Sequence, residues 1–107
     1  MVMHHMHIML NHAAEMAAEG SNLLMVGQMN MAPGVDSLSI EHGTMMLNKA
    51  SELVHQVLEG EAMQNLHRRG ITPDKNEEMA YTHLLAYKVL NLIEVLKAMP
   101  SAMSQQQ

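Results

Sequence analysis

The sequence contains no cysteine, no phenylalanine and no tryptophan, and its two aromatic residues are both tyrosine. The missing cysteine excludes disulfide bonds, thiolate zinc sites, iron–sulfur clusters and covalently attached c-type haem. It does not fix the compartment, because a soft-metal protein of an oxidising cell envelope can use thioether sulfur instead of thiol. With so few aromatic rings, Met, Leu, Ala and Val must supply the core.

Basic residues and long apolar runs are also scarce. The chain has six Lys and Arg against eleven Asp and Glu, and its formal charge is −5. We therefore expect no nucleic-acid partner. No run of about 18 apolar residues occurs, so we expect no membrane span. The first residues lack the charged and apolar regions of a signal peptide, which predicts a cytoplasmic protein, or a periplasmic or envelope protein if a signal was removed.

Helical periodicity covers most of the 107 residues. The first predicted helix spans residues 3–31 and ends before Pro33 and Gly34. The second begins near Asp36 or Ser37, which are good helix caps, and continues to residue 69 unless Gly60 breaks it.

The third predicted helix begins at Thr72-Pro73-Asp74, a cap followed by proline in the first turn, and ends at Pro100. The sequence therefore predicts an all-α fold: an antiparallel bundle of three long helices, or four if the second breaks near Gly60. We expect one domain over residues 1–100 and a disordered tail over residues 101–107.

Two packing features accompany this pattern. Small residues recur every seven positions on the apolar faces of the first two helices, at Ala13, Gly20, Gly27, Gly43 and Ala50. Glycine inside a helix costs about 1 kcal/mol relative to alanine, so we expect a compensating close approach of the two backbones. The third helix is apolar on two sides, one with Tyr81, Leu85, Val89 and Leu92 and the other with Met79, Ala86 and Leu90. Either a helix split off from the second one covers the second side, or another subunit does, and of the two we expect a homodimer.

The chain is rich in methionine and histidine, with fourteen Met and eight His. Antiparallel folding groups these residues by height along the bundle. One end gathers Met3, His4, His5, Met6, His7, Met63, His67, Met79 and His83, and the other gathers Met25, Met29, His42, Met45, Met46, Met99 and Met103. The middle holds His12 and Glu15 against Glu52 and His55.

The most informative single pattern is His5, Met9, His12 and Met16, because spacings of four, three and four place these side chains along one helical stripe. The stripe lies at the edge of the apolar face. Imidazole suits Cu(II), zinc and nickel, and thioether selects Cu(I), so the mixture predicts a copper site. His42 and Met46 form a second pair, also four residues apart.

Other interpretations compete with this one. Methionine at helical spacing is usually core, and a histidine at the border of an apolar face is usually solvated. Paired His12-x-x-Glu15 and Glu52-x-x-His55 suggest a di-iron centre, but Glu52 and His55 should point to solvent. A noncovalent haem needs a roomy slot that close glycine packing would remove.

Two segments resemble known sequences. His12-Ala-Ala-Glu-Met-Ala-Ala-Glu-Gly and Glu41-His42-Gly-Thr-Met-Met are similar to short His/Met motifs of uncharacterised bacterial helical-bundle proteins, some of them exported and associated with copper. The resemblance covers about the first half of the chain. It implies a four-helix or ferritin-like bundle, metal binding and an envelope location.

The sequence thus predicts a non-enzymatic metal-binding bundle that buffers or carries copper, with zinc, nickel or iron as other possible ions. The predicted ligands are His5, Met9, His12 and Met16 in one site and His42 and Met46 in a second. Uptake should fail below about pH 6, because only neutral imidazole binds metal. The alternative is a dimeric helical interaction module whose Met-rich surface receives a partner or a hydrophobic ligand.

Overall fold

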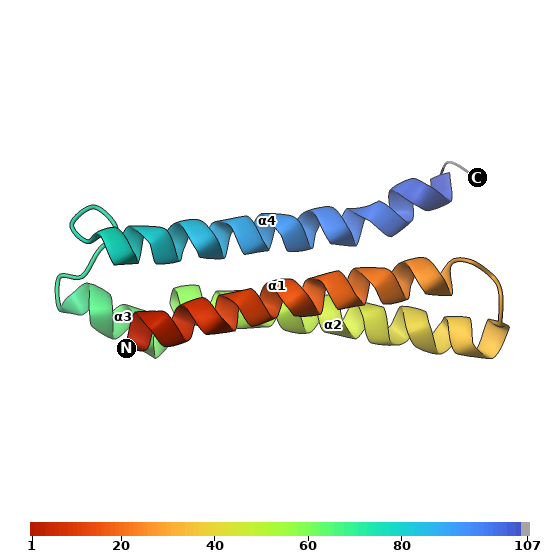
Figure 1. Ribbon diagram of the computed structural model, residues 1–107, viewed down its shortest axis with the longest axis horizontal. Helices are drawn as coiled ribbons and strands as arrows, with labels where there is room; N and C mark the ends of the chain where they lie inside the picture. The colour runs from red at the N-terminus through yellow and green to blue at the C-terminus, as the bar shows by residue number, and fades with distance from the viewer. Residues whose placement is uncertain (106–107) are drawn as a thin grey trace.

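The computed structural model describes the backbone of residues 1–105 and the side chains of residues 1–98. Within that range the chain forms α1 (Val2–Gly27), α2 (Pro33–Glu59), α3 (Glu61–Arg68) and α4 (Glu77–Gln105). Helices α1 and α2 form an antiparallel hairpin, α3 lies at the end that holds the N-terminus, and α4 returns along the hairpin (Figure 1). The predicted all-α bundle is confirmed, and the second predicted helix breaks at Gly60, which gives the four-helix alternative.

The turn between α1 and α2 lies earlier in the sequence than predicted, because α1 ends earlier and α2 begins earlier. Helix α1 ends at Gly27, and Asn30 adopts a left-handed φ of 56°, which asparagine tolerates better than most residues. Helix α2 begins at Pro33, not at Asp36, because proline is well suited to the first helical position. The Asp36 carboxylate then accepts the backbone N–H of Ala32 at 3.0 Å.

Both ends of α4 differ from the prediction. The helix begins at Glu77 rather than Thr72, and its cap is Asn76, whose Oδ1 accepts the N–H of Met79 at 2.9 Å. It continues through Pro100 to Gln105, so the predicted end at Pro100 is wrong. Proline removes one backbone hydrogen bond but keeps a helical φ. The predicted tail, residues 101–107, therefore begins within α4, and residues 106–107 lie outside the described residues.

Helices α1 and α2 approach each other closely where two glycines face. A Cβ added to Gly20 would lie 2.9 Å from the carbonyl oxygen of Gly43, and one added to Gly43 would lie 2.7 Å from the carbonyl oxygen of Gly20. Ala13 and Ala50, which belong to the same small-residue repeat, are fully buried. The predicted close approach of the two backbones is therefore confirmed.

The core is built mainly from aliphatic side chains, with Leu10, Leu47, Val54, Met63, Met79 and Ile93 among its most deeply buried members. Of the methionines with described side chains, only Met6, Met63 and Met79 are buried in this core. Met9 and Met16 are half-buried beside it. Most of the described methionine side chains are therefore at least partly exposed to solvent and are not buried in the core.

Helix α4 is rotated relative to the face that the sequence predicts. Met79, Ala86 and Ile93 point into the core, whereas Tyr81 and Leu92 are exposed. Monomer packing therefore covers the side that was expected to need a second subunit, and it leaves the tyrosine side open. Among the described helices, none has both the length and the apolarity that crossing a bilayer requires, as predicted.

Candidate metal-binding sites

Three of the predicted ligands lie in a groove between α1 and α2. Met9, His12 and Met16 project from one stripe of α1 because of their helical spacing. Together with Lys49, Glu52, Leu53 and Gln56 they line an open groove of about 370 Å³, which we call the α1/α2 groove. His12 is exposed, and the two methionines are half-buried. The groove therefore holds two thioethers and an imidazole on one wall and a carboxylate on the other.

The charges of the α1/α2 groove lie on its α2 wall. Glu52 Oε2 lies 3.6 Å from Lys49 Nζ, and both side chains are more than half exposed. Such a surface ion pair contributes little, so the Glu52 carboxylate can turn toward a cation at small cost. Lys49 opposes cation binding, because its positive charge repels any cation in the groove.

The remaining predicted ligands do not join this groove. His5 is exposed and is not among the groove's lining residues. Met46 is half-buried and lines a different groove with Glu19, Asn22, Leu23 and Val26, and the exposed His42 is not part of that lining. The structure therefore brings together three residues of the first predicted site, and of the second pair only Met46 lines a groove.

The predicted solvent exposure of Glu52 and His55 is confirmed. His55 Nδ1 lies 2.7 Å from Oε2 of Glu59 on the same helix, and His55 is not among the residues that line the α1/α2 groove with His12. Among the described side chains, no group of three or more His, Asp or Glu residues could hold one metal ion. Any metal held by that part of the chain needs thioether sulfur, water or another molecule to complete its coordination.

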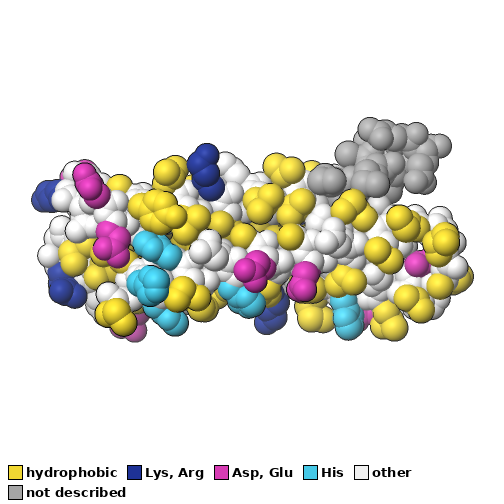
Figure 2. Space-filling view, in the orientation of Figure 1, with side chains coloured by type: hydrophobic (Ala, Val, Ile, Leu, Met, Phe, Trp, Pro, Cys, Tyr) yellow, Lys and Arg dark blue, Asp and Glu magenta, His cyan; other side chains and the backbone are white. Residues whose placement is uncertain are grey.

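Histidines are concentrated at the end of the bundle that contains the N-terminus, as Figure 2 shows in cyan, and others are spaced along the molecule. At that end the structure brings His67 of α3 and His83 of α4 together. Their Nε2 atoms lie 3.3 Å apart, their ring planes are 18° from parallel, and their centroids are 5.4 Å apart. The centroids are farther apart than the nitrogens, so the Nε2 edges of the rings face each other.

Local backbone structure fixes the position of His67 at the end of α3. Gly70 adopts a left-handed φ of 84°, and the N–H of Ile71 donates to the carbonyl of Leu66 at 3.0 Å, which is the C-terminal motif that glycine favours. The guanidinium of the neighbouring Arg68 hydrogen-bonds to Asn65 Oδ1, on its own helix. The imidazole is therefore presented by a defined helix terminus.

The pKa of His83 is lowered from its usual value, first because burial penalises the charged imidazolium and second because His67 adds positive charge nearby. The ring of Tyr87 lies beside His83, with centroids 6.2 Å apart. At neutral pH, His83 is therefore held in the uncharged form that metal binding requires.

A third histidine at this end has a structural role. Thr82 Oγ1 donates to the carbonyl of Glu78 at 2.8 Å, so it must accept from His7, whose Nε2 lies 2.7 Å away. The rings of His7 and Tyr81 also pack nearly perpendicular to each other, with centroids 5.0 Å apart. These contacts fix the proton of neutral His7 on Nε2 and join the start of α1 to α4.

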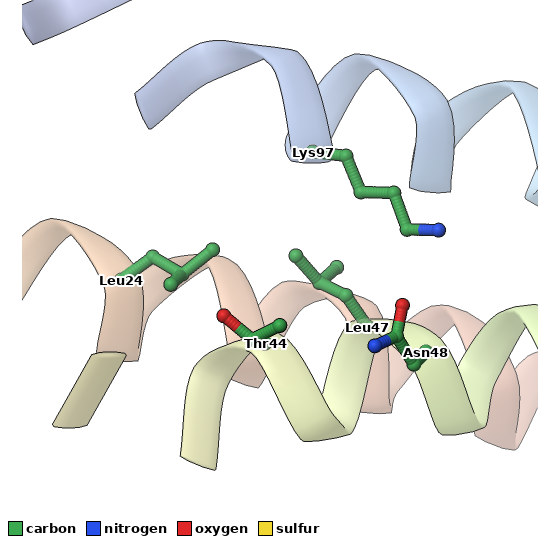
Figure 3. Close-up of a pocket in the computed structure, with 5 residues that line it drawn as sticks. All are labelled: Leu24, Thr44, Leu47, Asn48 and Lys97. Carbon is green, nitrogen blue, oxygen red and sulfur yellow. The ribbon is translucent and has the colours of Figure 1, made fainter. Parts of the chain in front are cut away.

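A further pocket lies between α1, α2 and α4 (Figure 3). It has a volume of about 240 Å³ and is lined by Leu24, Thr44, Leu47, Asn48 and Lys97. The side chain of Lys97 extends from α4 on the side of Leu47 and Asn48 (Figure 3). The lining contains no imidazole, carboxylate or thioether, and the lysine repels cations, so this pocket is unsuited to metal.

Sequence reasoning placed His67 and His83 at the same end of the bundle but did not pair them. It also placed Glu52 at the height of His12 without identifying it as part of a common groove. Residue spacing within one helix could predict neither the His67–His83 contact nor the position of Glu52 opposite His12, because each involves two helices. Comparison with known protein families, curated protein sequences and solved structures found no match to this chain.

Proposed function

We propose that this chain is a metal-binding helical bundle that buffers or carries copper and does not catalyse a reaction. The observation that supports this most directly is the α1/α2 groove, where Met9, His12 and Met16 face Glu52. Thioether is a soft donor that prefers Cu(I), and imidazole binds both copper oxidation states. The carboxylate adds negative charge to the opposite wall.

The openness of the groove is consistent with buffering or transfer. The two methionines are only half-buried and His12 is exposed, so a bound ion remains accessible to water and to exchange partners. The net charge of −5 favours the approach of cations in general. A purely structural ion would instead call for a closed set of protein ligands.

The test is a Cu(I) titration of the full chain under reducing conditions, against a chromophoric competitor for the metal. Replacing Met9 and Met16 by leucine removes sulfur while nearly preserving volume, so the fold should be retained. We expect the affinity for Cu(I) to fall by about 10-fold or more in this double variant and in His12→Gln. Met45→Leu, an exposed methionine of α2 outside the groove, is the matched control and should bind as the wild type does.

Two outcomes of this titration would count against the proposal. One is undiminished Cu(I) binding by the double leucine variant, and the other is equal weakening by Met45→Leu, which would indicate nonspecific thioether binding. His5→Ala should weaken binding less than His12→Gln, because His5 is not part of the groove lining. Loss of copper binding below about pH 6 would agree with an imidazole ligand.

The exposed side of α4 favours a second candidate function, a dimeric helical interaction module. Both tyrosines of the chain lie there, Tyr81 at 53% and Tyr87 at 54% exposure, together with Leu84 and Val95. Apolar surface of this kind is typical of contact sites. Light scattering on the metal-free protein tests this candidate. A wild-type dimer that persists in chelator, together with a monomeric Leu84→Glu variant, would support it. A monodisperse monomer would contradict it.

A further inference from the structure

The distance between the His67 and His83 nitrogens is suited to a shared metal ion. Two nitrogens bound to Zn²⁺ at about 2.0–2.1 Å with a tetrahedral angle lie roughly 3.3–3.4 Å apart. Adjacent nitrogens in a square-planar site would be roughly 2.9 Å apart, and opposite ones in a linear site roughly 4.1 Å apart. The two Nε2 atoms lie 3.3 Å apart, which matches the tetrahedral case.

A direct hydrogen bond explains the contact less well. The usual donor–acceptor distance for a nitrogen donor in proteins is about 2.7–3.2 Å, so 3.3 Å is long. Only one of the two nitrogens can carry the intervening proton, because a proton on each Nε2 would place two N–H donors head to head. An ion between the two edges would satisfy both lone pairs at once, with the remaining protons on the Nδ1 atoms.

The surroundings of the pair favour a cation. Both rings are half-buried, which leaves room for water at the open side of an ion. The nearest basic side chain along α3, Arg68, is bonded to Asn65.

We propose that His67 and His83 form a zinc-class site that links α3 to α4, with water in the remaining coordination positions. This site is independent of the α1/α2 groove, because its ligands come from α3 and α4 while the residues of the groove come from α1 and α2. Its consequence is structural: an ion shared by two helices binds the folded chain and not the unfolded one, and it therefore stabilises the fold.

The first experiment follows thermal unfolding of the full chain with Zn²⁺ alone or with chelator. At a zinc concentration about ten times the dissociation constant, the melting temperature should rise by about 5 °C or more. His67→Gln and His83→Gln should each abolish the rise and lower zinc affinity at least 10-fold. His55→Gln, an exposed histidine of α2, and the Met9→Leu/Met16→Leu double variant should retain both effects.

A second measurement, by NMR, uses the wild-type chain and does not depend on the folding of the His67 and His83 variants. In the wild-type chain, Zn²⁺ should shift the nitrogen NMR resonances of Nε2 in His67 and His83 and leave those of His55 unchanged. Unshifted Nε2 resonances, or a zinc-induced rise in melting temperature that survives both glutamine variants, would overturn the proposal. Loss of zinc binding in the double leucine variant alone would place the ion in the groove and also overturn it. Failure of copper binding would leave this site unaffected.

Discussion

Gly43→Ala should destabilise the bundle, although alanine is the better helix former. The added methyl carbon would lie 2.7 Å from the carbonyl oxygen of Gly20 and 3.0 Å from the backbone nitrogen of Leu24. The Leu24 Cγ, at 2.9 Å, can rotate away, but the other two obstacles are backbone atoms of α1 and cannot. The two helices must separate by roughly half an ångström or more, which weakens dispersion contacts along the whole seam.

The magnitude follows from two opposing effects. Alanine favours the helix by about 1 kcal/mol relative to glycine. Overpacking a tight interface costs about 1–3 kcal/mol, and rigid backbone obstacles place this site toward the upper end. The expected net loss in the free energy of unfolding is about 1–2 kcal/mol, which lowers the melting temperature of a domain of this size by about 5–10 °C.

Gly34→Ala provides the matched control, since a Cβ at Gly34 would meet nothing within 4 Å and the residue lies in the first turn of the same helix. It should raise stability by a few tenths of a kcal/mol up to about 1 kcal/mol. Chemical denaturation monitored by circular dichroism measures both variants. If Gly43→Ala proves as stable as Gly34→Ala, the two backbones do not meet at the Gly20–Gly43 seam and the reasoning is refuted.

Three further predictions concern single side chains. The pKa of His83 is lower in the folded than in the unfolded state, so its contribution to the free energy of unfolding is complete above about pH 6.5 and is lost as pH falls through the folded-state pKa. The stability of the wild type should therefore decrease on acidification more steeply than that of His83→Gln, and equal slopes would contradict this. Asn76→Ala removes the cap on the Met79 N–H and should cost about 1 kcal/mol in urea unfolding, while Asn76→Asp should cost much less; an unchanged Asn76→Ala would argue against capping. Lys49→Gln removes the positive charge beside the α1/α2 groove and should strengthen copper binding about 2- to 5-fold at low salt, with a smaller gain at high salt; weaker binding would oppose this electrostatic account.

Local patterns in the chain predicted much of the scaffold. The helical stripes gave the number of long helices, and Gly60 marked the break between α2 and α3. The repeat of small residues by itself indicated the close seam between α1 and α2. Helix ends were less accurate, because α2 and α4 begin where Pro33 and Asn76 suit the first turn, and α4 runs through Pro100.

The candidate sites show where such patterns stop being sufficient. Residue spacing alone places Met9, His12 and Met16 on one side of α1, since a helix fixes side-chain direction within itself. It does not fix which residues of a second helix stand opposite, because that depends on the rotation, register and separation of two packed helices. Only the tertiary structure therefore placed Glu52 in the groove, turned the tyrosines of α4 outward, and brought the Nε2 atoms of His67 and His83 within 3.3 Å.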